Sequence, residues 1–401
     1  MLQVILGGLL PLPARQMNPT KALFPVVFVH GLGGWGEGAP LDSLLSDWGA
    51  MDSLVEKGYE CYIADVGAIS SAWDRACELY AHLTGTRVDY GAAHAAQNNH
   101  ARFGKDYRRP LVPGWGPERK LHLIGHSFGG PTIRLFAQLC EEGSAAERAA
   151  TSKDKLSPLF SGELKGRIAS ITTLASPHNG SSATESVIMA ETSIDKLITA
   201  FRVLAVAGEV VPLVGAALPL QLDQFGISFW GFWTTPWKAV KNYKNLNDGH
   251  DVSLTDLTVD GAAALNNTIR CLPGIYYFSY AGKLTEDDGQ GNQMPKDGMY
   301  SILQSPATAM GRKREPFKTA GGILIDAKWA ASDGIVNTVS ALYPFGDPHR
   351  DYNPQKLKPG VWNVMPVLAW DHFRYVKSSD DVCAFYLDLM HILEQLPDSA
   401  L

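Results

Sequence analysis

A glycine-rich stretch, Gly125–Gly130, constrains the fold of this chain more than any other part of its sequence. It fits the pattern G-x-S-x-G, follows the apolar run 121–124 and precedes a helical pattern over 130–142. A serine at the tip of such a strand-to-helix turn has strained backbone angles, and the flanking glycines avoid clashes. The N–H groups at the start of the helix face the charge that develops during attack. We therefore predict that Ser127 is a nucleophile; the alternative is a glycine-rich turn with an incidental serine.

Short apolar runs and helical patterns alternate along the chain and indicate its fold class. The first run, 25–29, is continuous, which is typical of a strand buried on both faces of a parallel sheet. Further strand-like runs occupy 59–64, 121–124, 167–174, 275–280 and 361–367. Helical patterns occupy 41–55, 70–83, 130–142 and 381–396. The alternation predicts an α/β protein with a mostly parallel central sheet and helices on both faces.

Composition narrows the class of protein further. The 401 residues are 45% hydrophobic and 19% charged, which is enough for a sizeable core and excludes disorder as the main state. The formal charge of -6 argues against nucleic acid or an anionic membrane as the main partner. No apolar run reaches the roughly 18–20 residues of a membrane span. Five scattered cysteines exclude a disulfide framework and a thiolate metal site, although one disulfide stays open.

Two segments depart from the strand–helix pattern. One, at about 84–117, is rich in Ala, His, Asn, Gly and Pro. The other, at about 181–265, joins an apolar helix-like stretch, 194–218, to a cluster of four aromatic residues: Trp230, Phe232, Trp233 and Trp237. No linker-like composition separates independent units, so we predict one domain over 1–401 that carries both insertions. The second insertion is either a helical lid over Ser127 or a segment packed permanently on the core.

The other members of a catalytic triad must follow the serine in the order acid, then histidine. His372 lies directly after a predicted strand, where a catalytic histidine is expected. The other downstream histidines are His178, His250, His349 and His391. Asp333 is the preferred acid because it lies at a strand end and is followed by a glycine. Its rivals are Asp326, Asp347 and Asp371.

A second glycine-rich turn, 30–34, follows the first predicted strand. In this architecture such a loop supplies one N–H group to an oxyanion hole, and the residue after the nucleophile supplies the other. The pattern predicts that the backbone N–H groups of Leu32 and Phe128 are the donors of this oxyanion hole. Alone, the turn is equally consistent with an ordinary glycine turn; its pairing with the serine motif favours the oxyanion hole.

Seven motifs together resemble one known family. They are FVHGLGGWGEG, SSAWDRACELYAHLTGTRVDYGAAHAAQNNHARFG, GHSFGG, ASPHNG, LDQFG, SDGIVNTVS and WDHF. In register from about residue 25 to the C-terminal helix, the chain is similar to the zinc-containing bacterial lipases of the Geobacillus and Staphylococcus type. The resemblance implies an α/β-hydrolase fold and hydrolysis of carboxylic esters, usually triacylglycerols, through a serine acyl-enzyme. It also implies Ser127, Asp333 and His372 as the triad.

The resemblance further implies a metal site. By spacing alone, His94 and His100 would be two surface histidines. The family pattern makes them ligands of Zn²⁺ together with Asp74 and Asp223, which ties the 84–117 insertion to the lid region. Two imidazoles and two carboxylates suit Zn²⁺, and four protein ligands leave no open position, so the ion is expected to be structural.

Several expectations depend on where the chain departs from this pattern. A calcium-binding glutamate of the family is replaced by Arg374, and a nearby Asp-Pro segment is missing, so we expect no calcium site of the family type. The lid region matches poorly, which keeps an esterase or polyesterase open as an alternative. A non-catalytic, zinc-stabilised binding protein is the second alternative. The resemblance implies secretion; the N-terminal residues lack a basic region typical of a signal peptide, so a cytoplasmic location also stays open.

Overall fold

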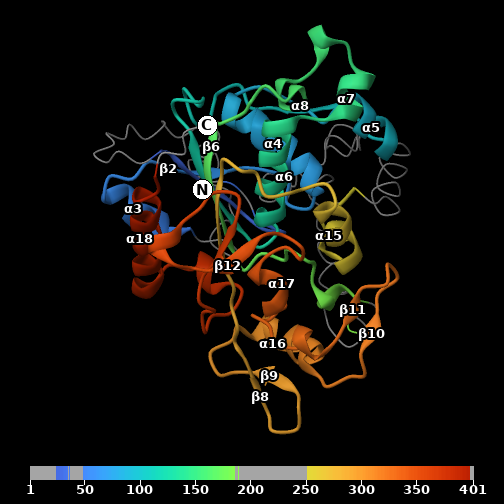
Figure 1. Cartoon of the computed structure of the whole chain (residues 1–401), viewed down its shortest axis with the longest axis vertical. Coiled ribbons are helices and arrows are strands. Elements are labelled where there is room, and N and C mark those ends of the chain that lie inside the picture. The colour runs from blue at the N-terminus through green and yellow to red at the C-terminus, as the bar shows by residue number, and fades with distance from the viewer. Residues whose placement is uncertain (1–23, 35, 37–47, 186–187, 189–250, 398–401) are drawn as a thin grey trace, which may run out of the picture.

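A parallel sheet forms the centre of the computed structural model, which describes residues 24–34, 36, 48–185, 188 and 251–397. Its seven strands lie in the order β12-β13-β7-β6-β5-β1-β2, and every neighbouring pair is parallel. The sheet lies in the middle of the molecule, between the helices (Figure 1). The strands are β1 (Val26–Val29), β2 (Cys61–Ala64), β5 (Leu121–His126), β6 (Ile168–Leu174), β7 (Tyr276–Tyr280), β12 (His349–Asp351) and β13 (Trp362–Val364). The predicted α/β class with a parallel sheet is confirmed.

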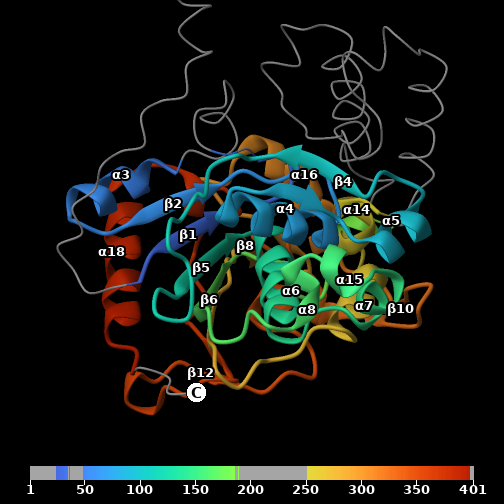
Figure 2. The same ribbon diagram turned by 90° about the horizontal axis from the view of Figure 1, so that it is seen from above.

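Helices cover both faces of this sheet. Helices α4 (Ala72–Thr84) and α6 (Gly129–Glu142) lie on one face, and α3 (Gly49–Glu56) and α18 (Asp380–Glu394) lie on the other (Figure 2). Strand β1 shows why its sequence is continuously apolar: Val27 and Val29 pack into the first core, whereas Val26 and Phe28 pack into the second. All four of these side chains are buried. This two-sided burial is the property that the apolar run predicted.

Smaller elements surround the sheet and its helices. The other helices of the described residues are α5 (Ala92–Asn98), α7 (Ala145–Ala150), α8 (Pro158–Ser161), α14 (Ser253–Leu257), α15 (Val259–Asn266), α16 (Ser301–Gly311) and α17 (Thr338–Leu342). Three antiparallel pairs of short strands are β3 (Arg87–Asp89) with β4 (Phe103–Asp106), β8 (Thr285–Asp287) with β9 (Gln293–Pro295), and β10 (Phe317–Lys318) with β11 (Leu324–Ile325). Single 3-10 turns are η1 (Lys153–Lys155), η2 (Ser182–Thr184), η4 (Ala327–Trp329), η5 (Pro354–Lys356) and η6 (Arg374–Val376).

Helix α5 and strands β4 and β12 differ from the sequence expectations. The 91–117 segment, which lacks a core pattern, contains helix α5 and strand β4, and within α5 only Ala95 is buried. Strand β12 was not predicted, because it is a polar edge strand. The aromatic and apolar stretches of the 181–265 insertion fall between 189 and 250, outside the described residues, so the lid and the single-domain arrangement stay predictions. Within the described part of the chain, no helix is long and apolar enough to cross a membrane.

Candidate active site and metal centre

Ser127 lies in the sharp turn between strand β5 and helix α6, with a left-handed φ of 54°. Its backbone N–H donates to the carbonyl of Leu174 (2.8 Å), and the residue is 8% exposed. The glycines on either side are required by close approach of backbone. A Cβ atom on Gly129 would lie 2.1 Å from the carbonyl oxygen of Val29, and one on Gly125 would lie 2.6 Å from the carbonyl carbon of Gly129. The turn is therefore strained in the way that the motif predicts.

Two side chains from distant parts of the sequence complete a hydrogen-bonded chain with this serine. His372 Nε2 lies 2.9 Å from Ser127 Oγ, and His372 Nδ1 lies 2.8 Å from Asp333 Oδ2. The other carboxylate oxygen of Asp333 accepts the backbone N–H groups of Ile335 (3.1 Å) and Val336 (2.8 Å). The carboxylate is buried and held, so it can orient the imidazole as a base toward the serine hydroxyl.

His126 connects the serine turn to the backbone of the histidine loop. Its Nε2–H donates to the carbonyl of His372 (2.8 Å), and the two rings lie 4.8 Å apart. Burial, and then the neighbouring His372, hold the pKa of His126 well below its usual range. A neutral ring at this position fixes the loop without adding a positive charge beside the base.

The other sequence candidates have separate partners or lie elsewhere. Asp371 accepts the backbone N–H groups of Tyr300, Phe373 and Arg374, so it shapes the loop beside His372. The remaining candidates with partners away from Ser127 are Asp326 (backbone of Lys328), Asp347 (indole of Trp362), His178 (hydroxyl of Thr173) and His349 (ring of Tyr343). His391 is exposed on α18, and His250 lies outside the described residues.

The loop after β1 passes directly beside the serine. A Cβ atom on Gly31 would lie 2.6 Å from the Cβ atom of Ser127, so only glycine fits there. This contact brings the backbone of Leu32 to the same end of the sheet as that of Phe128, the buried residue that follows Ser127. The arrangement is compatible with the two N–H groups predicted for an oxyanion hole.

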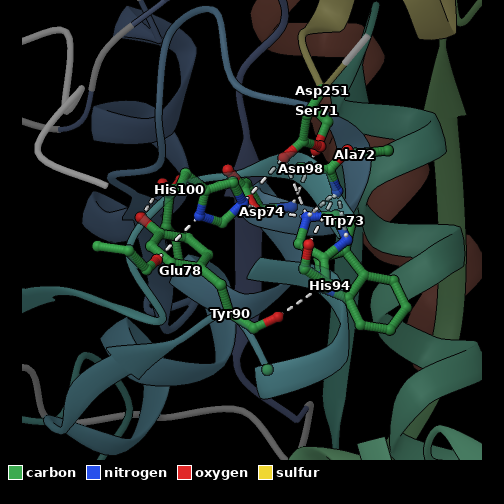
Figure 3. A network of polar contacts seen from close by, with 12 residues as sticks. Ser71, Ala72, Trp73, Asp74, Glu78, Tyr90, His94, Asn98, His100 and Asp251 are labelled. Carbon is green, nitrogen blue, oxygen red and sulfur yellow. Dashed lines mark hydrogen bonds and ion pairs between the residues drawn. The ribbon is translucent and has the colours of Figure 1, made fainter. Parts of the chain in front are cut away.

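Four side chains form a second cluster around the start of α4. They are Asp74, His94, His100 and Asp251, and their ligand atoms all lie within 4.8 Å of one another (Figure 3). Asp251 Oδ2 lies 3.0 Å from Nε2 of both His94 and His100, and Asp74 Oδ1 lies 3.2 Å from His94 Nε2. Burial and the charge of Asp251 raise the pKa of Asp74. Two buried carboxylates and two imidazoles facing one another are a donor set that fits a divalent cation.

The fourth member of this cluster was not predicted. The family resemblance implied Asp223 at that position, which lies outside the described residues, whereas the structure places Asp251 there. The segment that carries Asp251 is fixed to the start of α4, because Val252 pairs with Ser70 and Ser253 N–H donates to the carbonyl of Ile69 (3.0 Å). No local pattern around Asp251 signals a ligand, since its partners are more than 150 residues away in sequence.

Neighbouring groups hold the histidines of the cluster in place. The buried carboxylate of Glu147 accepts the backbone N–H groups of Ala93 (3.0 Å) and His94 (2.8 Å) at the start of α5. Trp73 stacks on the ring of His94 with centroids 5.0 Å apart, and its indole N–H donates to the carbonyl of Tyr90 (2.8 Å; Figure 3). Such supporting contacts orient metal ligands before the ion binds.

Arg374 forms an ion pair close to the histidine loop. Its Nη2 lies 2.7 and 2.6 Å from the two carboxylate oxygens of Asp381 at the start of α18. We expect calcium to raise the melting temperature of the protein by less than about 1 °C, because a guanidinium already neutralises this carboxylate and would repel a dication. Thermal unfolding with and without calcium measures this.

The Arg374→Glu variant is the matched test of that explanation. It restores two carboxylates at this place, so calcium should stabilise the variant more than the parent. Magnesium serves as the control ion. A large calcium-dependent stabilisation of the parent protein would contradict the expectation.

Comparisons with known proteins agree with this geometry. The family model described as "Lipase-like, C-terminal domain" matches residues 22–396. "Lipase 2" of Staphylococcus aureus (strain MSSA476) is 34% identical over 384 residues, covering 91% of this chain and 52% of the relative. "Lipase" of Staphylococcus epidermidis is 34% identical over 367 residues, covering 88% of this chain and 50% of the relative. The chain thus spans about half the length of the curated relatives it matches.

Two solved structures extend the comparison to three dimensions. The Staphylococcus hyicus lipase is similar with a TM-score of 0.82 and 29% identity, covering 95% of this chain and 98% of that one. EstA from Clostridium botulinum is similar with a TM-score of 0.79 and 31% identity, covering 98% of this chain and 93% of that one. Both likenesses span nearly all of each chain.

Proposed function

Because this chain belongs to the family described as "Lipase-like, C-terminal domain", we propose that it is a lipase, which hydrolyses acylglycerol esters through a serine acyl-enzyme. The resemblance to Staphylococcus-type lipases that the motifs indicated is confirmed. One observation carries the proposed chemistry: the hydrogen-bonded chain from Asp333 through His372 to Ser127, at 2.8 and 2.9 Å, on a strained turn.

The proposed reaction uses the same groups in both half-reactions. Ser127 Oγ attacks the ester carbonyl carbon while His372 Nε2 takes its proton. Asp333 holds the imidazole and stabilises its protonated form. The N–H groups of Leu32 and Phe128 bind the oxyanion, which collapses as His372 returns the proton to the leaving alcohol. Water then attacks the acyl-enzyme, again with His372 as base, and releases the carboxylic acid and the free serine.

The substrate class can be tested by the physical state of the ester. As a lipase, the protein should hydrolyse emulsified short-chain triglyceride faster than the same ester in true solution, because lipids present an apolar surface that a lipase binds. Release of fatty acid is titrated across the solubility limit of the triglyceride. A smooth hyperbolic curve through that limit, with fast cleavage of p-nitrophenyl acetate, would indicate an esterase instead.

Labelling with a fluorophosphonate distinguishes an enzyme, whether lipase or esterase, from a non-catalytic binding protein. The probe forms a covalent bond with an activated serine hydroxyl. Stoichiometric labelling at Ser127 is the expected result. Absence of labelling would indicate that the protein is a non-catalytic binding protein.

The metal cluster is proposed to hold Zn²⁺ as a structural ion. Asp74, His94, His100 and Asp251 would supply two oxygen and two nitrogen ligands, which is a common set for zinc. When bound, the ion would join α4, α5 and the segment before α14, and it would take no part in bond breaking. We also propose that the protein acts outside the cell, as the family resemblance implies.

A further inference from the structure

Arg75 lies beneath the loops that face Ser127, and no motif in the sequence analysis assigns it a role. It follows the metal-cluster residue Asp74 on helix α4, and its side chain is completely buried. An arginine guanidinium keeps its positive charge in proteins, even where it is buried. A buried cation is costly unless each donor finds an acceptor, and the acceptors of Arg75 are unusual in their position.

One end of the guanidinium binds the loop that precedes Leu32. Nη2 donates to the carbonyl of His30, and Nη1 donates to the carbonyls of Gly67 (2.7 Å) and Gly31 (3.5 Å). The carbonyl of Gly31 and the N–H of Leu32 belong to the same planar peptide unit. The same carbonyl also accepts from His30 Nδ1 (2.9 Å), so the imidazole and the guanidinium together fix it. Fixing that carbonyl fixes the direction of the Leu32 N–H, which points to the opposite side of the unit.

The other end of the guanidinium reaches the turn that contains the nucleophile. Arg75 Nε donates to Thr132 Oγ1 (2.9 Å), and this hydroxyl donates to the carbonyl of Phe128 (3.0 Å). The guanidinium carbon also lies 5.4 Å from the centroid of the Phe128 ring. One side chain thus connects the two backbone segments that carry the proposed oxyanion donors.

We propose that Arg75 is a positioning residue that holds the oxyanion hole in its working geometry. A cation on the carbonyl of a peptide unit also withdraws electron density, which strengthens the N–H of that unit as a donor. Arg75 should affect the chemical step only when negative charge develops on the substrate oxygen, because donors placed in advance act mainly in the transition state. This inference rests on the proposed function, since it assigns a role within the same site.

The test compares two buried arginines on the same face of the sheet. Arg75→Met removes the cation and its donors, and Arg75→Lys keeps the charge but loses the planar fork. The matched control is Arg134, which is also buried and binds Asn266 Oδ1 (2.9 Å) from helix α6. Arg134→Met and Arg134→Lys measure the effect of disturbing a buried arginine elsewhere. Melting temperature, kcat and KM are measured for every variant with a soluble p-nitrophenyl ester.

An alkyl trifluoromethyl ketone supplies a readout that loss of stability would not change. Ser127 Oγ adds to its carbonyl carbon, the hydroxyl proton passes to His372, and the product carries an oxyanion in the proposed hole. We expect Arg75→Met to lower kcat by about 10- to 100-fold, less than the 10²–10³ for deletion of a donor, because the donors are displaced and not removed. Affinity for the ketone should fall in proportion to kcat/KM while KM changes little, and Arg75→Lys should be intermediate.

Three outcomes decide the inference. If Arg75→Met and Arg134→Met lose stability alike and neither changes kcat or ketone affinity in the folded protein, Arg75 is only structural and the inference fails. If Arg75→Met does not fold, Thr132→Val removes the link to Phe128 and should still lower kcat several-fold at unchanged KM; no change there also overturns the inference. If the unmodified protein neither cleaves esters nor binds the ketone, the proposed function itself is wrong.

Discussion

Replacing Ser127 by alanine should lower kcat for ester hydrolysis by roughly 10⁴- to 10⁶-fold, because loss of a triad nucleophile removes the acyl-enzyme route. The substitution deletes one oxygen atom and its contact with His372 Nε2, and it leaves the buried turn between β5 and α6 otherwise intact. The melting temperature should therefore change by only a few degrees. Initial rates with a p-nitrophenyl ester and thermal unfolding measure the two effects.

Ser279→Ala is the matched control for this substitution. Ser279 is completely buried on β7, and its hydroxyl donates to the carbonyl of Leu342, away from His372. This variant should keep its rate within a few-fold of the parent, so a general effect of losing a buried hydroxyl would be visible. If Ser127→Ala, purified free of other esterases, kept more than a few per cent of the parental rate, Ser127 would not be the nucleophile.

The fold could be predicted from sequence because the apolar pattern within each main element indicates which of its side chains are buried. Strand β1 is apolar at every position, since its side chains enter cores on both faces of the sheet. Helix α4 lies where the helical pattern 70–83 predicted a helix, and Ser71 Oγ caps its start by accepting the N–H of Asp74 (3.2 Å). Strand β12 escaped prediction because two of its three residues are exposed and polar, so only its pairing with β13 makes it a strand.

The candidate active site was also accessible from sequence, for a different reason. The turn around Ser127 is specified by residues two positions away on either side, so its pattern is local. Parallel strands bring their C-terminal ends to one edge of the sheet, where the loops that follow them meet. His372 was chosen because it follows a predicted strand, and it lies in the loop after β13. Asp333 was expected at a strand end, but it lies in a loop next to Ser332, which forms only an isolated bridge with Asn337. The contacts at 2.9 and 2.8 Å place both side chains at that edge.

Arg75 and Asp251 could not be found in this way, because their roles depend on contacts that no local pattern encodes. Arg75 lies within a helix, and its acceptors are the hydroxyl of Thr132, which is distant in sequence, and backbone carbonyl groups, which any residue type can provide. Asp251 follows a long segment of weak resemblance, so its register against α4 could not be read from the sequence. The pairing of Val252 with Ser70 and the hydrogen bond from Ser253 N–H to the carbonyl of Ile69 reveal that register.

Asp251→Asn should remove most of the bound zinc and lower the melting temperature by about 10 °C, because metal-binding energy is folding energy in a structural site. The amide oxygen is a weaker, uncharged ligand, and it leaves Asp74 as the only carboxylate of the cluster. Metal analysis of the purified protein should give about one zinc per chain for the parent and far less for the variant. A chelator should lower the melting temperature of the parent toward that of the variant.

The matched variant Asp223→Asn distinguishes the two candidate ligands, since the family pattern and the structure assign the fourth position differently. If Asp251 is the ligand, Asp223→Asn should retain zinc and the parental melting temperature, and only Asp251→Asn should lose both. If instead only Asp223→Asn lost zinc and stability, Asp223 would be the ligand. Asp251 would then only form hydrogen bonds with His94 and His100. If both variants kept their zinc, neither Asp223 nor Asp251 would be a ligand. The reason is that a structural zinc site loses affinity when an amide replaces a charged ligand.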